Sequence, residues 1–248
     1  MSLFLGWLDK QVEENLDRLK RKKQTDIWVT DLVKCRYKRE LEMRMPHVSA
    51  IDGMRGNLVL GKLAHIGLRG TADTIVTEIP LEMAVDVGGE RYRVVGQVDA
   101  LVGKSGVAEI WELKTGSDVK DIEGSSHHVV QVWVYYLMVE ALRRGEAGFA
   151  EDAVFLEIEK ERVMDMLGGS LEPYIVYVTK GRVLVVPVRR ERVERAVREI
   201  YGVTAGCDGV ADIVAAWLNS KVPLMSWECN YCPYRELCPY RGGSQKLG

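Results

Sequence analysis

Hydrophobic residues recur every three or four positions in several segments of the chain. Residues 3–24 carry such a stripe, formed by Leu8, Val12, Leu16 and Leu19. Residues 125–145 carry a second and longer one. Because an α-helix has 3.6 residues per turn, both segments are predicted to be amphipathic helices. Further helices are predicted, with Thr30 as the cap of the first, at residues 31–44, 58–70, 190–202 and 210–220.

The pattern changes in the first half of the chain, where β-branched residues dominate. Three such runs, separated by glycine-containing turns, occupy residues 73–87, 90–103 and 106–116. Residues 153–159 predict a further strand, and residues 173–179 with 182–188 predict a hairpin. Helices and strands therefore alternate as helix, three strands, helix, strand. This order is typical of a mixed α/β fold, with a sheet flanked by helices.

The composition is that of an ordinary soluble protein, with 47% hydrophobic and 28% charged residues among 248. No apolar run approaches the length of a membrane span, and the N-terminal stretch is too short for a signal peptide. We therefore expect a cytoplasmic protein without a membrane segment. The net charge of -2 does not by itself indicate a nucleic-acid partner. Basic runs that fit solvated helix faces occur at residues 18–23, 34–40 and 189–198.

Charged residues interrupt two neighbouring apolar strands. Asp99 ends the run VVGQVDA, while Glu112 and Lys114 flank Leu113 in EIWELKTG. Since alternate residues of a strand share a face, Glu112 and Lys114 point the same way, and Asp99 can meet them from the next strand. Burying such charges is costly unless a cation pairs with the carboxylates, and oxygen ligands suit Mg²⁺ or Mn²⁺. The alternative is a surface salt bridge between Glu112 and Lys114.

A cation held by Asp99, Glu112 and the main-chain carbonyl of Leu113 would be suited to phosphodiester hydrolysis. Such an ion polarises the phosphoryl oxygen and lowers the pKa of a bound water. Lys114 would position that water or neutralise charge at phosphorus. His65, on the predicted helix before the strands, could add a ring nitrogen to the metal, although a lone histidine there is also compatible with a structural role.

Two polar residues of the long predicted helix share one face. Gln131 and Tyr135 are four positions apart, and the helix follows the strand that carries Glu112. Both could hold the substrate backbone or orient the lysine, and ordinary helix polarity explains them equally well. His127 falls on the same face with His128 beside it, and we read both as residues without a special role.

Three of the five cysteines lie close together near the C-terminus, in the pattern Cys229-x-x-Cys232-x5-Cys238. In a reducing compartment such clusters bind metal more often than they form disulfides. A site of this type normally takes four ligands, so a fourth is expected elsewhere in the chain. Four thiolates fit either zinc or an iron–sulfur cluster.

Taken together, these motifs resemble the RecB-like nucleases of the PD-(D/E)xK superfamily. GQVDA, ELKTG and QVWVY resemble its D…ExK…QxxxY signature, and GKLAH resembles the histidine-bearing helix of that branch. WVTDLVKCRYKREL with CNYCPYRELC resembles the cysteine arrangement of the iron–sulfur members. The match, over about residues 30–240, is nearest to the CRISPR-associated RecB-like exonucleases, the fourth Cas family. One departure is Val98, where the superfamily signature has proline.

The resemblance implies a restriction-endonuclease-like core, with a central mixed sheet, in a single nuclease domain. Within it, residues 1–57 would form a helical region, residues 58–190 the nuclease core, and residues 191–248 the last helices and the cysteine-rich tail. The resemblance also implies that catalysis with Mn²⁺ or Mg²⁺ depends on His65, Asp99, Glu112 and Lys114. Gln131 and Tyr135 match the third motif of the family.

The family's cysteine arrangement makes Cys35 the fourth ligand, together with Cys229, Cys232 and Cys238. It favours an iron–sulfur cluster, [4Fe-4S] in preference to [2Fe-2S], and leaves Cys207 as a plain thiol. Such a site would tie the N-terminal helical region to the C-terminal tail, and so restrict the unfolded chain.

The function implied by the resemblance is exonucleolytic cutting of single-stranded DNA, from the 5′ end toward the 3′ end. Members of the family process new spacers during CRISPR adaptation, alongside the integrase proteins. Two alternatives remain open. One is a DNA-end-binding adaptor of the integrase with vestigial cleavage. The other is a repair nuclease outside CRISPR, held together by zinc or an iron–sulfur cluster.

Overall fold

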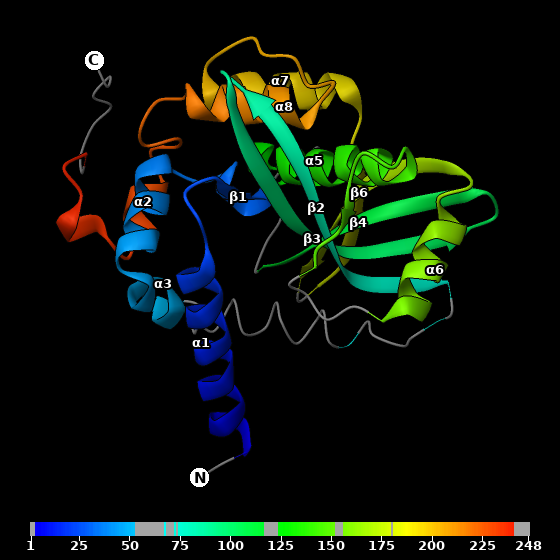
Figure 1. Ribbon diagram of the computed structural model, residues 1–248, viewed down its shortest axis with the longest axis horizontal. Helices are drawn as coiled ribbons and strands as arrows, with labels where there is room; N and C mark the ends of the chain where they lie inside the picture. Colours follow the sequence, from blue (N-terminus) through cyan, green and yellow to red (C-terminus); the bar gives the residue numbers. More distant parts are fainter. Residues whose placement is uncertain are drawn as a thin grey trace.

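The computed structural model describes residues 3–52, 67, 72, 74–116, 124–151, 156–179 and 181–240. Figure 1 shows a twisted sheet with helices packed on it, and a helical N-terminal region beside the C-terminal tail. The long helix α5 contacts the sheet, and α7 in turn packs on α5. The predicted fold class, a mixed α/β fold with a central sheet flanked by helices, is confirmed.

The sheet has the strand order β5-β2-β3-β4-β6-β7, and β1 pairs with β3 off this path. Its strands are β1 (Asp26–Trp28), β2 (Ile75–Val87), β3 (Glu90–Lys104), β4 (Val107–Gly116), β5 (Gly148–Phe149), β6 (Ser170–Thr179) and β7 (Val183–Pro187). The neighbours β2, β3 and β4 are antiparallel, whereas β4 and β6 are parallel. A parallel pair needs a crossover connection, and α5 lies in the segment that joins β4 to β6.

The helices are α1 (Leu3–Arg21), α2 (Arg36–Arg44), α3 (Pro46–Asp52), α5 (Ser126–Arg143), α6 (Glu157–Met166), α7 (Arg190–Tyr201), α8 (Val210–Leu218) and α9 (Glu228–Tyr231), with short 3-10 turns η1 (Val29–Asp31) and η2 (Arg235–Leu237). Helix α5 is apolar on most of its surface, which is typical of a helix enclosed on several sides. Among the described residues, no helix has the length and apolar character needed to cross a membrane.

The strand predicted at residues 153–159 is wrong where the structure describes it. Helix α6 begins at Glu157, and the first part of the predicted segment lies outside the described residues. A short apolar run of this kind is compatible with a strand or with a helix. Leu156 and Ile158 are instead exposed, and the helix buries Val163. The helix predicted at residues 58–70 lies outside the described residues.

The second predicted helix begins only at Arg36, and Thr30 does not cap it. Thr30 belongs to the turn η1, which the Asp31 carboxylate holds by accepting the Trp28 N–H at 2.8 Å. Because Asp31 is used in this way, the chain turns before the helix begins. The residue that precedes Arg36, and so occupies the N-cap of α2, is Cys35.

Candidate active site and cysteine-lined pocket

The acidic residues of β3 and β4 meet where the ladder between these strands stops. The last pair on that side is Ala100 with Trp111, although β4 continues beyond it alongside β6. At this point the Oδ2 atom of Asp99 accepts the Leu113 N–H at 2.7 Å. A carboxylate therefore takes the place of a main-chain carbonyl, and the two strands part around it.

Glu112 and Lys114 form a close pair beside this carboxylate, as their spacing predicted. Lys114 Nζ lies 2.5 Å from Glu112 Oε1 and donates to Gln131 Oε1 at 3.1 Å. Glu112 is only 2% exposed, so its charge needs a nearby cation. A simple surface salt bridge between Glu112 and Lys114 is thereby excluded.

The charges around Lys114 set the protonation of the site. Burial alone would lower the pKa of Lys114, but Glu112 and Asp99 raise it above its ordinary value. Burial raises the pKa of Asp99 to about 6, against the opposing effects of Lys114 and the Leu113 amide. The lysine is therefore a fixed cation. The Asp99 carboxylate, by contrast, would be stabilised by additional positive charge.

Helix α5 presents the two predicted polar residues to the same place. Gln131 is buried and contacts Lys114, while Tyr135 is buried against β3 beside Gly96. Burial raises the pKa of Tyr135 well above its ordinary value, so its phenol stays protonated. The structure thus brings Asp99, Glu112, Lys114, Gln131 and Tyr135 together. His65 lies outside the described residues.

His128 and Tyr177, for which the sequence predicted no special role, also lie near Lys114. His128 Nδ1 lies 3.0 Å from the hydroxyl of Tyr177, and Tyr177 is the partner of Lys114 in the β4–β6 register. Burial and the charge of Lys114 lower the pKa of His127 to about 4 and that of His128 to about 2. Both rings are therefore neutral near pH 7. The one signal in the sequence was the spacing of His127, four positions before Gln131 on the same helix face.

The donor set at the strand ends suits a hard divalent ion. Asp99, Glu112 and the Leu113 carbonyl offer only oxygen, which is the ligand type that Mg²⁺ and Mn²⁺ prefer. Across the part of the chain that the structure describes, no three cysteine, histidine or acidic side chains are grouped tightly enough to hold one ion. The two carboxylates and a carbonyl are nonetheless a fitting partial coordination sphere, because Mg²⁺ usually keeps several water ligands.

A second group of reactive side chains lines a pocket between α2 and the C-terminal tail. The four cysteines named by the family resemblance all contribute to it: Cys35, Cys229, Cys232 and Cys238. Glu228 fastens the tail to α2, because its carboxylate accepts the N–H of Cys35 at 2.9 Å and that of Met225 at 2.8 Å. Tyr234 is buried in the same region and donates to the Met45 carbonyl at 3.0 Å.

Cys35 is buried in this pocket, whereas the other three thiols are partly exposed. Burial raises the pKa of Cys35 to about 11, and it also raises the pKa values of Cys229 and Cys232. Such thiols ionise readily only beside a strong positive charge, such as a metal ion. Cys207 does not line the pocket. It is buried elsewhere, and its carbonyl accepts the indole N–H of Trp133 at 2.8 Å.

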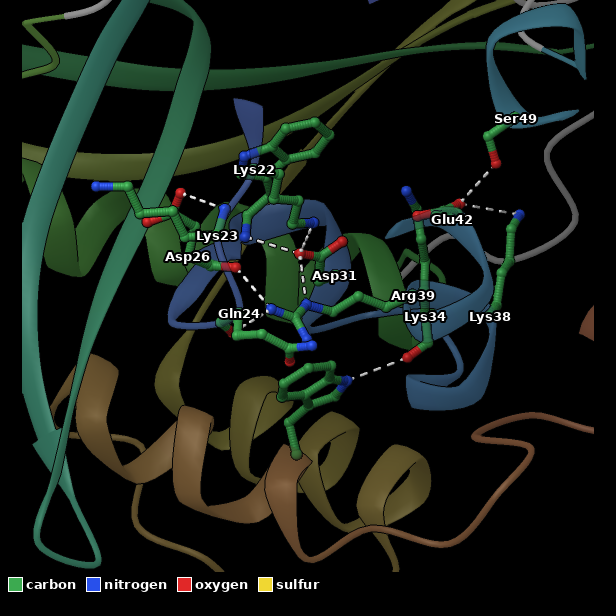
Figure 2. Close-up of polar contacts among 12 residues, drawn as sticks. Lys22, Lys23, Gln24, Asp26, Asp31, Lys34, Lys38, Arg39, Glu42 and Ser49 are labelled. Carbon is green, nitrogen blue, oxygen red and sulfur yellow. Dashed lines mark hydrogen bonds and ion pairs between the residues drawn. The ribbon is translucent and has the colours of Figure 1, made fainter. Parts of the chain in front are cut away.

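Buried ion pairs hold the segment that leads to Cys35 (Figure 2). Lys22 at the end of α1 pairs with Asp31 at 2.5 Å, and both side chains are inaccessible to solvent. Arg39 of α2 donates to the carbonyls of Gln24 at 2.7 Å and Asp26 at 2.8 Å. These contacts join α1, β1 and α2 into one unit, which presents the first turn of α2 to the tail.

Comparisons with known proteins agree with this architecture. The model of the PD-(D/E)XK nuclease superfamily matches residues 10–239. The chain is 24% identical over 236 residues to the CRISPR-associated exonuclease Cas4 of Saccharolobus solfataricus, which covers 94% of this chain and 95% of that protein. The crystal structure of SSO0001 has a similar fold, with a TM-score of 0.68, 20% identity and 98% coverage of each chain. Since the family match spans nearly the whole chain, this protein belongs to the PD-(D/E)XK nuclease superfamily, whose members are nucleases that use a divalent metal ion.

Proposed function

We propose that this protein is a DNA exonuclease whose metal ion is held by Asp99, Glu112 and the Leu113 carbonyl. The observation that carries the proposal is the break in the β3–β4 ladder, where Asp99 binds the Leu113 amide beside the buried Glu112–Lys114 pair. These three ligand groups are all oxygen donors, which supports Mn²⁺ or Mg²⁺. His65 remains a further proposed ligand on the strength of the family motif.

When bound, the ion would polarise the phosphoryl oxygen and lower the pKa of a coordinated water. Lys114, which contacts Glu112 and Gln131, would act as a hydrogen-bond donor to the reacting phosphate or the attacking water. Gln131 holds the lysine from the side of α5. Tyr135, a buried and protonated phenol on the same face, is hydrogen-bonded to Gln131 and so helps to hold the residue that contacts the lysine.

We further propose that Cys35, Cys229, Cys232 and Cys238 bind an iron–sulfur cluster. Support comes from their convergence on one pocket and from their pattern in the sequence, which resembles that of the iron–sulfur members of the family. Four thiolates fit either zinc or an iron–sulfur cluster, and the family pattern favours [4Fe-4S], with [2Fe-2S] as the second choice.

The substrate and biological role follow from the relative in Saccharolobus solfataricus, which is a CRISPR-associated exonuclease. By this likeness we propose that the protein trims DNA with single-stranded ends, from 5′ to 3′, during the processing of new CRISPR spacers in the cytoplasm. Its partners would be the CRISPR integrase proteins. The alternatives are an integrase adaptor with vestigial cleavage, and a repair nuclease outside CRISPR.

The decisive experiment is a cleavage assay on single-stranded DNA with Mn²⁺, using strands labelled at either end. A 5′ label released as a mononucleotide at the first cut identifies 5′-to-3′ cutting. Lys114→Ala should lower the cleavage rate at least about 100-fold while binding persists, since a preorganised charge at the reacting phosphate is lost. Lys160→Ala is the matched control, because that lysine pairs with Glu157 on α6.

Each outcome separates the candidate functions. If Lys114→Ala cuts as fast as the wild type, the assignment of the lysine is wrong. If the wild type binds DNA ends and cuts nothing with either metal ion, the adaptor function is favoured. If it cuts but does not associate with the integrase proteins, a role outside CRISPR is favoured.

A further inference from the structure

An exposed tryptophan of the cysteine-rich tail lies beside the helix that carries the active-site residues. The ring centroids of Trp227 and His127 are 5.4 Å apart, with the planes tilted by 53°. His127 is one helical turn before Gln131, which contacts Lys114. The tail therefore reaches the approach to the active site, although it is distant from that site in the sequence.

The exposure of this aromatic residue is unusual among the tryptophans. Trp227 is 46% exposed, whereas Trp133 and Trp217 are buried and donate their indole N–H groups to main-chain carbonyls. Tyr231, one turn further along the tail, is 65% exposed. Large rigid aromatic surfaces that remain in water beside a functional site are typical of ligand contacts.

The main chain next to this indole is held firmly. Glu228, the following residue, accepts the N–H groups of Cys35 and Met225. On the other side, His127 stands on α5, a helix packed between the sheet and α7. Both rings are therefore presented by anchored segments, as a binding surface with a defined geometry requires.

We propose that Trp227 and His127 form a stacking platform for a nucleobase of single-stranded DNA, next to the active site. The inference rests on the proposed nuclease function and names the part of the substrate that these residues recognise. A flexible single strand needs more than a metal ion at one phosphate to be held in register. Stacking on aromatic rings supplies this hold and accepts any base, because every base has a flat π-face. In an intact duplex the bases are stacked on each other, so the platform would distinguish single strands from duplexes.

The platform gives the cysteine-lined pocket a role in substrate binding. The pocket fixes the tail against α2, and the tail in turn places the indole beside α5. The cysteines would thus influence DNA binding through the position of Trp227, without contact with the substrate.

The test is equilibrium binding of fluorescent oligonucleotides in a Lys114→Ala background, which keeps the strand intact. Trp227→Ala should weaken single-strand affinity about 5- to 100-fold, the range expected for loss of one base–aromatic stack. Blunt duplex affinity should change less than about 2-fold. Trp227→Phe should retain most of the affinity, and Leu237→Ala should change nothing, since Leu237 is 60% exposed on the same tail without being aromatic.

A second measurement locates the stacked base. A single abasic position is moved along the oligonucleotide, and the wild-type platform should lose affinity sharply at one position only. Trp227→Ala should show no further loss at that position, because the stack is already absent. Unchanged single-strand affinity in Trp227→Ala, or an equal loss for duplex, would overturn the platform. The platform would also be overturned if Trp227→Ala lost affinity at the same abasic position, and to the same extent, as the protein that keeps Trp227.

The fate of the platform is separable from that of the nuclease. If the wild type cuts no DNA and Trp227→Ala weakens single-strand binding, the platform is supported and the proposed nuclease activity is contradicted. If the wild type cuts DNA and Trp227→Ala binds single strands equally well, the nuclease activity is supported and the platform is contradicted. Unchanged thermal unfolding of Trp227→Phe confirms that its binding data report on the ring.

Discussion

The ring of Tyr135 lies directly against Gly96, and a methyl group at residue 96 would approach its Cε1 atom to 2.6 Å. Val29 closes the other side, with its Cγ2 atom 2.7 Å from the same position. The glycine therefore allows α5 to approach β3 closely. This approach brings Gln131, on the same face of α5 as Tyr135, to within hydrogen-bonding distance of Lys114.

Gly96→Ala should consequently destabilise the fold and displace the active-site face of α5. Overpacking of this kind costs about 1–3 kcal/mol. Urea denaturation measures the free energy of unfolding, and the cleavage assay should show reduced activity in the same variant. Gly148→Ala is the control, because an added methyl group there meets no atom within 4 Å. Equal stability of the two variants would show that the chain relaxes around residue 96 at no cost.

The grouping of the proposed catalytic residues at the strand ends could be predicted from the sequence because its signal is local. Asp99, Glu112 and Lys114 interrupt apolar runs with a period of two, and Gln131 with Tyr135 follows the helical period. These periods fix which side chains share a face. The break in the β3–β4 ladder was not predicted, since it depends on a hydrogen bond from Leu113 between two strands.

Other features depend on contacts that no local pattern encodes. His128 acquires its environment from Tyr177, which is 49 residues away in the chain. Cys35 meets Glu228 across 193 residues, and here only the family resemblance indicated the partner segment. The segment at Leu156 and Ile158 misled because a short apolar run fits a strand as well as a helix. Leu156 precedes α6, Ile158 lies on it, and both side chains are exposed.

The buried Lys22–Asp31 pair predicts a large effect from a single truncation. Lys22→Met leaves the Asp31 carboxylate inaccessible to solvent without its closest cation, and breaking a buried pair in this way costs about 3–5 kcal/mol. Lys10→Met is the matched change within α1, the helix that precedes Lys22, where the pair with Glu14 is exposed and worth at most about 0.5 kcal/mol. Chemical denaturation at pH 7 compares the two. A loss at Lys22 no greater than that at Lys10 would show that Arg39 compensates fully.

The histidine beside Tyr177 predicts a distinctive dependence of stability on pH. The pKa of His128 falls from about 6.5 to about 2 on folding, chiefly through burial, so protons bind the unfolded chain preferentially. The neutral ring therefore contributes stability above pH 6.5 that is lost as the pH falls, by about 2.7 kcal/mol at pH 4.5. His127, Lys114 and Tyr177 surround it, and the charge of Lys114 opposes its protonation.

His128→Gln should accordingly be less stable than the wild type at pH 7, where it disturbs the contact with Tyr177, and should lose this disadvantage by pH 4.5. Thermal and urea unfolding at both pH values measure the difference. His47→Gln replaces an exposed histidine on α3. Its difference from the wild type in the free energy of unfolding should be the same at both pH values. A gap between His128→Gln and the wild type that does not change with pH would show that the ring protonates in the folded state.

The proposed iron–sulfur cluster leads to the prediction that a substitution at Cys35, which is distant from the tail in the sequence, abolishes cofactor binding. Cys35→Ala should lose the visible absorbance and the bound iron of anaerobically purified protein, and lower the unfolding temperature by about 10 °C or more, since cofactor binding contributes directly to folding. Cys207→Ala should keep both, because Cys207 lies outside the pocket. Metal analysis of the wild type distinguishes a colourless zinc protein from an iron–sulfur protein. Full iron content in Cys35→Ala would show that another residue is the fourth ligand. The cofactor would then not link α2 to the tail through Cys35.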